Sequence, residues 1–131
     1  LIKEPEIEVK DVTLASFDLS QIGINLALAI QNPNALGMTL KSVSFDVHYK
    51  NGEEWVFISH GERRKFEIKP GDNAVTIPLS IKTSEIPTAL AGALLEGAIT
   101  LKITGTARPD LLLIAPEIPF SKVKTLSLTQ D

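Results

Sequence analysis

The chain has 131 residues, a formal net charge of −3 and no cysteine, and 44 % of its residues are hydrophobic while 22 % are charged. This composition is typical of a globular protein, and the length predicts a single domain over residues 1–131. The absence of cysteine excludes disulfides, thiolate metal sites and a cysteine nucleophile, and the acidic balance argues against nucleic acid and anionic membrane surfaces as partners.

The N-terminus has no signal peptide, and no stretch of the chain approaches the roughly 20 apolar residues of a membrane span. The chain begins at Leu1 rather than Met. We therefore expect a segment upstream of Leu1, which leaves two locations open: cytoplasmic, or exported or membrane-anchored through that segment.

The first two predicted strands differ in the regularity of their apolar pattern. Residues 5–19 hold three apolar pairs whose phase slips from one pair to the next, which is typical of a long strand broken by bulges. Residues 22–30 instead place an apolar residue at every second position, with small or polar residues between them. That period of two predicts a central strand with one apolar face and one thinly covered or solvated face.

The central strand is predicted to end in the turn Asn32-Pro33-Asn34. Pro33 has no N–H to give to a strand ladder, and it holds Asn32 in extended geometry. The short amides of Asn32 and Asn34 can form hydrogen bonds with nearby backbone as the chain turns. We interpret the three residues as a structural turn and not as a binding site.

A hairpin is predicted around Asn51-Gly52, because both residues tolerate the positive φ angles of a type I′ turn. In the preceding strand, residues 38–49, the apolar residues change parity near Lys41, which predicts a bulge or a strand that crosses between sheets. The returning strand covers residues 55–68, and its polar middle part is expected to be solvated or bulged at Gly61.

Residues 75–81 repeat the period of two after a turn at Pro70-Gly71-Asp72, and Pro78 lies on the face opposite the apolar set. Proline is tolerated in a strand only where its missing N–H is not needed. We therefore expect this strand to be an edge strand, or to be interrupted at Pro78.

A single short helix is predicted over about residues 85–95. Ser84 is its expected cap, Pro87 is compatible only with its first turn, and Gly97 is its expected end. A spacing of four residues gives the helix one apolar stripe, formed by Ile86, Leu90 and Leu94.

The chain ends in two further predicted strands. One alternates over residues 99–103 and is expected to end at Gly105 and residues 108–110. The other covers about residues 112–128, and two prolines disrupt its start. About seven strands with frequent turns and one short helix together predict an all-β fold, an antiparallel β-sandwich.

The two histidines, His48 and His60, are predicted to lie on the surface, and the serines near them have no elbow motif that would make a catalytic triad. His60 and Glu62 form one pair that could begin a metal site. Asp46 and His48 form another, but a metal site needs three or four ligands. Because no glycine-rich phosphate loop is present either, we predict no catalytic residue, no metal ligand and no cofactor.

The remaining charged and aromatic residues allow two interpretations each. The carboxylates at residues 4–8 and 53–54 could suggest acid–base chemistry, but solvation is favoured there. The run Arg63-Arg64-Lys65 could contact a phosphate or an anionic lipid, although flanking glutamates cancel most of its charge. Trp55 and Phe57 could form a platform for a sugar or a partner, but a Trp beside alternating apolar residues favours the core.

Residues 26–49, LALAIQNPNALGMTLKSVSFDVHY, resemble the late embryogenesis abundant group 2 family, also called the water-stress and hypersensitive-response (WHy) domain. Members carry an apolar strand, an Asn-Pro-Asn turn and a second apolar strand, and Asn32-Pro33-Asn34 matches that turn. The later segments NAVTIPLSIKTS, GAITLKITGTA and IPFSKVKTLSL match in kind and order. The chain is therefore identified as a member of this family, of bacterial or archaeal type.

The resemblance implies a β-sandwich of immunoglobulin and fibronectin type III type and a role in tolerance of desiccation and other stress. No catalytic residues are attributed to the family, so only the Asn32-Pro33-Asn34 turn is carried over, as a structural feature. Our hypothesis is a non-enzymatic stress-protection protein that makes weak contacts with client proteins or membranes, with no nucleic acid and no small-molecule substrate. The alternative is a cell-surface or membrane-tethered adaptor that uses a strand edge or its loop tips.

Overall fold

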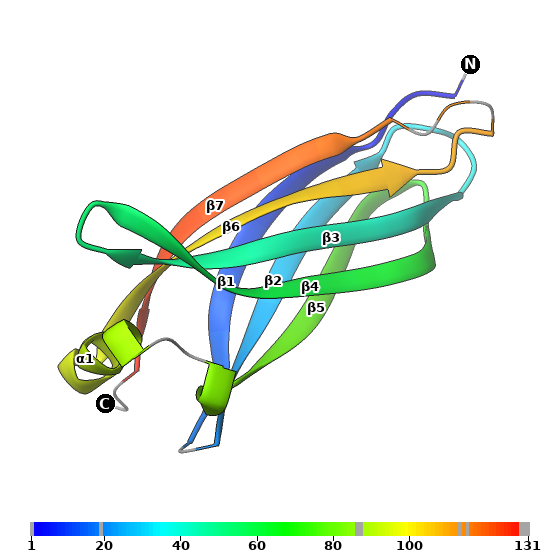
Figure 1. The fold of residues 1–131 in the computed structure, drawn as a ribbon. Coiled ribbons are helices and arrows are strands. Elements are labelled where there is room, and N and C mark those ends of the chain that lie inside the picture. Colours follow the sequence, from blue (N-terminus) through cyan, green and yellow to red (C-terminus); the bar gives the residue numbers. More distant parts are fainter. Residues whose placement is uncertain (1, 19, 86–87, 113, 115, 129–131) are drawn as a thin grey trace.

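The computed structural model describes residues 2–18, 20–85, 88–112, 114 and 116–128. They form seven strands in two antiparallel sheets that pack face to face, with strand orders β1-β2-β5 and β4-β3-β6-β7 (Figure 1). This confirms the predicted antiparallel sandwich. The elements are β1 (Glu6–Phe17), β2 (Gln21–Asn32), β3 (Met38–Asn51), β4 (Glu54–Ile68), β5 (Gly71–Lys82), the 3-10 helix η1 (Thr83–Glu85), α1 (Thr88–Glu96), β6 (Ala98–Pro109) and β7 (Ile118–Ser127).

The core lies between the sheets and is built from the alternating residues of the central strands. In β2 every second residue is buried and the residues between are half-buried or exposed, so the predicted central strand is confirmed. The largest side chains with almost no exposed surface come from both sheets and from the helix: Tyr49, Phe45, Ile24, Leu26, Leu28, Ile30, Leu40, Leu90 and Ile103.

Two of the predicted irregularities are confirmed. The register of β1 against β2 shifts between Val9 and Asp11 and again between Leu14 and Ser16, where the apolar phase slips. The register of β3 against β6 shifts next to Lys41, where the parity of β3 changes. Each shift returns the next apolar residue to the core face.

Of the two alternatives expected for the polar middle part of β4, solvation is confirmed and a bulge at Gly61 is not found. The register of β4 against β3 shifts further back, where Val47 pairs with Ser59 and His48 pairs with Phe57. Gly61 lies directly opposite Phe45 in a regular ladder, and any Cβ there would collide with the Phe45 ring. Glycine is present because the core ring needs its space. The polar part of β4 is largely exposed, as expected.

The hairpin between β3 and β4 is confirmed, but its predicted type I′ geometry is wrong. Asn51 pairs with Glu54, so the loop residues are Gly52 and Glu53. Only Gly52 has a positive φ, 66°, which is the pattern of a type II′ turn, in which glycine takes the first central position.

The predicted edge position of the strand that contains Pro78 is confirmed. β5 is the outer strand of the three-stranded sheet, and Pro78 pairs with Asn25 without interrupting it. An edge strand has one side with no ladder partner, so a residue without an N–H is tolerated there.

The predicted helix is confirmed as α1, whose residue Leu90 is completely buried and whose end is followed by Gly97 at a φ of 80°. Ser84 does not cap α1, because it lies inside η1. Ile86, Pro87 and the side chain of Leu94 lie outside the described residues. Within the described part of the chain, neither helix has the length and hydrophobicity needed to cross a membrane.

The last two predicted strands need two corrections. β6 continues through Gly105 to Pro109, because Gly105 leaves room for the Ser44 carbonyl and the Phe120 ring and does not interrupt the ladder. β7 begins at Ile118 and not near Leu112. The described residues between β6 and β7 belong to no helix or strand, and among them the Asp110 carboxylate accepts a hydrogen bond from the Leu112 N–H at 3.1 Å.

Candidate functional site

The Asn32-Pro33-Asn34 turn is organised by a buried amide. Asn32 is only 1 % exposed. Its Oδ1 accepts hydrogen bonds from the Asn34 backbone N–H at 3.0 Å and from the Asn34 Nδ2 at 2.8 Å, and its Nδ2 donates to the Leu36 carbonyl at 2.9 Å. The predicted bonding of these amides to the turn backbone is therefore confirmed, and it satisfies a polar group that would be costly to bury alone.

The same turn also holds the N-terminal segment, which the sequence pattern did not indicate. The Lys3 N–H donates to Asn34 Oδ1 at 2.7 Å, and Asn34 Nδ2 donates to the Lys3 carbonyl at 2.8 Å. One asparagine side chain thus pairs both backbone groups of a residue that lies far away in sequence. The turn joins the start of β1 to the loop between β2 and β3.

Asp46 and His60 form the arrangement that most resembles a catalytic pair. His60 Nδ1 lies 2.7 Å from Asp46 Oδ1, and both side chains are about half exposed. The pair lies beside a shallow hollow of about 240 Å³ on the outer face of the four-stranded sheet, lined by hydroxyl groups of Ser44, Thr104 and Thr106. Through this contact the carboxylate can orient the imidazole.

The two residue pairs considered as possible starts of a metal site have other partners. Asp46 pairs with His60, and Glu62 instead accepts a hydrogen bond from Arg64 at 2.6 Å. His48 lies on the outer face as predicted, with its ring edge-on to Phe57. Among the residues that the structure describes, no group of three or more histidine and carboxylate side chains is placed to share a metal ion.

The basic run at residues 63–65 is divided among separate contacts. Arg63 lies over the Phe66 ring at 4.3 Å, and the hydrogen bond to Glu62 raises the pKa of Arg64 above its ordinary value. Lys65 has a positive φ of 46°. The three cations therefore do not converge on one anion site, which favours the interpretation of a charged strand surface.

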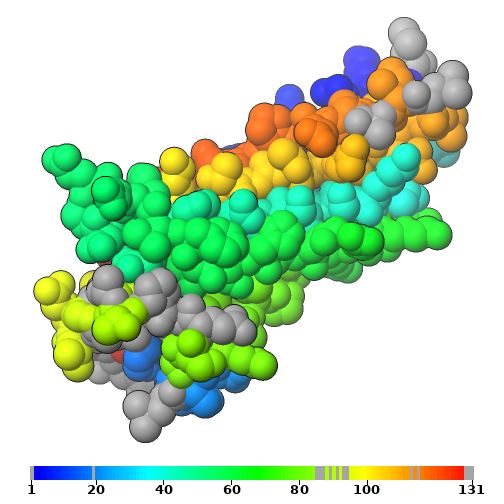
Figure 2. Space-filling model, viewed as in Figure 1, coloured from blue at the N-terminus to red at the C-terminus, as the bar shows by residue number. Residues whose placement is uncertain are grey.

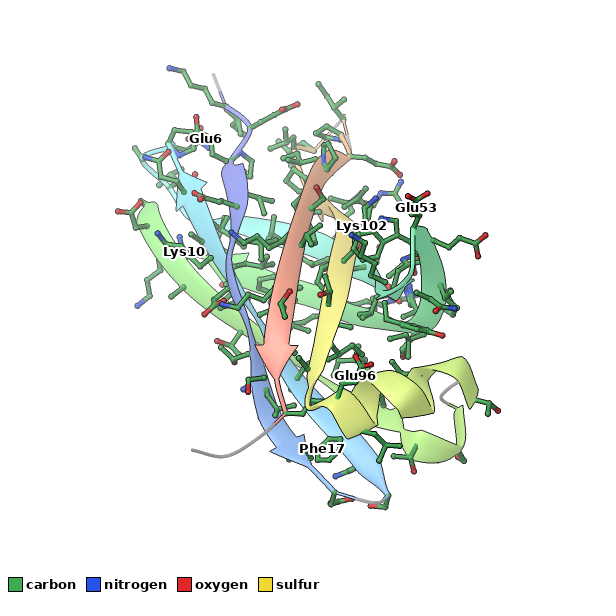
Figure 3. All side chains as sticks on the ribbon, turned by 90° about the vertical axis from the view of Figure 1, so that its left-hand side faces the viewer. Glu6, Lys10, Phe17, Glu53, Glu96 and Lys102 are labelled. Carbon is green, nitrogen blue, oxygen red and sulfur yellow. The ribbon has the colours of Figure 1, made fainter. Side chains whose placement is uncertain are left out.

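The prediction that Trp55 belongs to the core is wrong. Trp55 pairs with Lys50 across the ladder, on the outer face of the four-stranded sheet, and Lys102 Nζ lies 5.5 Å from the centre of its ring. Phe57 is 52 % exposed on the same face. The inner side of β4 is instead occupied by Val56, which pairs with the buried Tyr49. Figure 2 shows this outer face, and Figure 3 shows Lys102 on it near the hairpin that carries Glu53.

Two carboxylates, Asp11 within β1 and Asp18 directly after it, have lowered pKa values. A hydrogen bond from Lys124, at 2.9 Å, lowers the pKa of Asp11 and joins the edges of the two sheets between β1 and β7. Hydrogen bonds from the Ser20 hydroxyl and from the backbone of Ser20 and Gln21 lower the pKa of Asp18 in the turn between β1 and β2. Both groups are therefore better accommodated as carboxylates in the folded chain.

Comparison with known proteins finds a family-level match and several similar folds. The model of the family described as late embryogenesis abundant protein (LEA_2) matches residues 27–124. An uncharacterized protein of Methanocaldococcus jannaschii is 26 % identical over 120 residues, which is 90 % of this chain and 67 % of that protein.

Two solved structures have a similar fold at low sequence identity. The solution structure of an Arabidopsis thaliana protein is 19 % identical with a TM-score of 0.75, and the match covers 100 % of this chain and 86 % of the other. The crystal structure of an Archaeoglobus fulgidus protein is 10 % identical with a TM-score of 0.65, and it covers 99 % of each chain. At these identities the likeness concerns the fold alone.

Proposed function

The chain belongs to the late embryogenesis abundant protein family, and from this premise we propose that it is a non-enzymatic stress-protection protein that acts through weak surface contacts with macromolecules or membranes. The observation that carries the proposal is the family match, which extends from β2 to β7 and includes the Asn32-Pro33-Asn34 turn. The half-exposed Asp46–His60 pair is compatible with a non-enzymatic role, because the pair lies on an open sheet face and its hollow is shallow.

The finer assignment is also a proposal. We assign the chain to the WHy type within the family and to a bacterial or archaeal source, and the relative in Methanocaldococcus jannaschii supports an archaeal one. Its partners would be client proteins or a membrane surface, held weakly and without a cofactor. The acidic net charge of −3 is consistent with clients other than nucleic acid.

Drying a labile enzyme tests the proposal. The enzyme is dried or freeze–thawed with this protein, or with an equal mass of an unrelated β-sandwich of similar net charge, and its remaining activity is measured. We expect a clear excess of activity with this protein over the control. Equal activity in the two samples would contradict the proposal.

The outer face of the four-stranded sheet favours a second candidate, an adaptor module. Phe57 is 52 % exposed there and lies beside His48, so a partner could bury an aromatic surface. Recovery of one partner in stoichiometric amount by the intact protein, and its loss with Phe57→Ser, would favour this candidate over the first.

A further inference from the structure

Large apolar side chains gather in solvent at the end of the sandwich that holds the Asn32-Pro33-Asn34 turn. We call this region the apolar end; its members are Ile2, Leu36, Leu112 and Ile114, which are 54 %, 78 %, 80 % and 66 % exposed. They come from the N-terminal segment and from the loops β2–β3 and β6–β7, which lie together at one end of the molecule (Figure 1). Ile2, Leu36 and Leu112 line one open hollow of about 550 Å³.

The loop between β6 and β7 holds Leu112 in an unfavourable backbone conformation. Leu112 has a φ of 71°, a conformation that costs energy for residues with a Cβ and is rare for leucine. Its N–H donates to the Asp110 carboxylate at 3.1 Å, and the Leu111 N–H donates to the Ile114 carbonyl at 3.2 Å. A strained residue that points a large apolar side chain into water suggests a function for that side chain.

Three backbone groups beside the apolar side chains are already paired with asparagine side chains of the chain. Asn32 donates to the Leu36 carbonyl, and Asn34 pairs both the N–H and the carbonyl of Lys3. A partner that adds a strand needs free backbone groups, whereas an apolar medium penalises them. The apolar end therefore fits the hydrocarbon boundary of a bilayer better than it fits a peptide partner.

The charges around the hollow indicate which lipids suit it. Lys3 and Asp110 are the charged residues among those described as lining it, one of each sign. A surface that binds anionic headgroups needs a cluster of basic residues, which the described lining of this hollow does not supply. Attachment would then depend on apolar burial and would be insensitive to salt.

We propose that the apolar end inserts its leucine and isoleucine side chains into the interface of an electrically neutral phospholipid bilayer. The inference rests on the proposed function and specifies its membrane partner. The strands run lengthwise between the two ends, so the sandwich would stand on the membrane with α1 at the far end (Figure 1). Figure 3 shows the same polarity, with Glu6 toward one end and Phe17 and Glu96 toward the other.

Flotation with phosphatidylcholine vesicles tests the insertion. The variants are the full chain, the double variant Leu36→Ser with Leu112→Asn, and the matched control Leu95→Ser, which removes a leucine that is 90 % exposed on α1 at the opposite end. Asparagine tolerates the positive φ at residue 112, so the double variant should melt like the parent. Burial of each leucine supports about a tenfold gain in partitioning, so we expect the double variant to bind about a hundredfold more weakly and Leu95→Ser to bind like the parent.

Several outcomes would overturn the insertion. These are equal weakening by Leu95→Ser, binding that needs anionic lipid and is lost in high salt, or no flotation of the parent chain. A dimer in ultracentrifugation that the double variant converts to monomer, without vesicles, would show that a second copy covers the apolar end. The drying assay on a labile water-soluble enzyme separates the two proposals, because the parent chain should still protect that enzyme if only the insertion is wrong and should fail to protect it if the proposed function is wrong.

Discussion

The two ends of the sandwich expose apolar residues in different ways. At the apolar end, side chains from segments far apart in sequence share one hollow, and the buried Asn32 amide binds the turn that carries Leu36. At the other end, Leu95 is exposed on a helix whose buried contact is Leu90. The difference shows that exposure alone does not make a site. Convergence of exposed apolar side chains from several segments on one hollow distinguishes the first end from the second.

We expect the free energy of unfolding to fall more when the helix end loses its buried contact, Leu90, than when the apolar end loses a hydrogen-bonding side chain. Leu90→Ala removes a side chain with no exposed surface, and a cavity of this kind costs about 3 kcal/mol of the free energy of unfolding. Urea denaturation measures the loss. Hydrogen exchange should rise in α1 and leave the amide of Asn34 unchanged, and a loss below about 1 kcal/mol would show that the helix is not held by this residue.

The apolar end depends on hydrogen bonds in place of a buried leucine. Asn32→Ala leaves the Asn34 N–H and the Leu36 carbonyl without their partner, which should cost about 2 kcal/mol and loosen the N-terminal segment. The matched variant Asn34→Ala removes only exposed or partly buried bonds and should cost about 1 kcal/mol. Equal costs in urea denaturation would mean that burial of Asn32 is not what organises the turn.

The smallest expected effect is a loss of stability in acid at the helix end, where Asp18 accepts hydrogen bonds in the turn between β1 and β2. Hydrogen bonds from Ser20 lower the pKa of Asp18 below its ordinary 3.8 in the folded chain. Its stabilising contribution is therefore present above pH 3.8 and is lost as the pH falls through the folded pKa.

Asp18→Asn tests this effect, because it keeps an acceptor oxygen but cannot titrate. The exchange rate of the Gln21 amide, corrected for intrinsic exchange, should rise with acid in the parent and stay constant in the variant. An identical pH dependence in both chains would rule out Asp18 as the titrating group.

The sequence was sufficient to predict strands and turns whose structure depends on residues near them in the chain. The period of two located β2, the missing N–H of Pro78 indicated an edge strand, and short amides predicted the bonded turn at Asn32-Pro33-Asn34. Each of these properties depends on neighbours along the chain.

Several of the wrong predictions share a different cause, which is a partner far away in sequence. Gly61 and Gly105 make room for core rings from other strands, and spacing along one strand does not show that need. Trp55 and Val56 are both apolar, so only pairing with β3 decides which one faces inward. The apolar end was missed for the same reason, although the apolar run at residues 111–115, directly before Pro116, was a visible clue.

Dye retention in dried vesicles tests most directly whether the apolar end carries the protective contact with membranes. Phosphatidylcholine vesicles with an entrapped dye are dried and rehydrated with the parent chain, with the double variant Leu36→Ser and Leu112→Asn, or with Leu95→Ser. We predict equal retention with the parent and Leu95→Ser, and a loss of most of that protection with the double variant. Retention that is the same with all three chains would contradict the account.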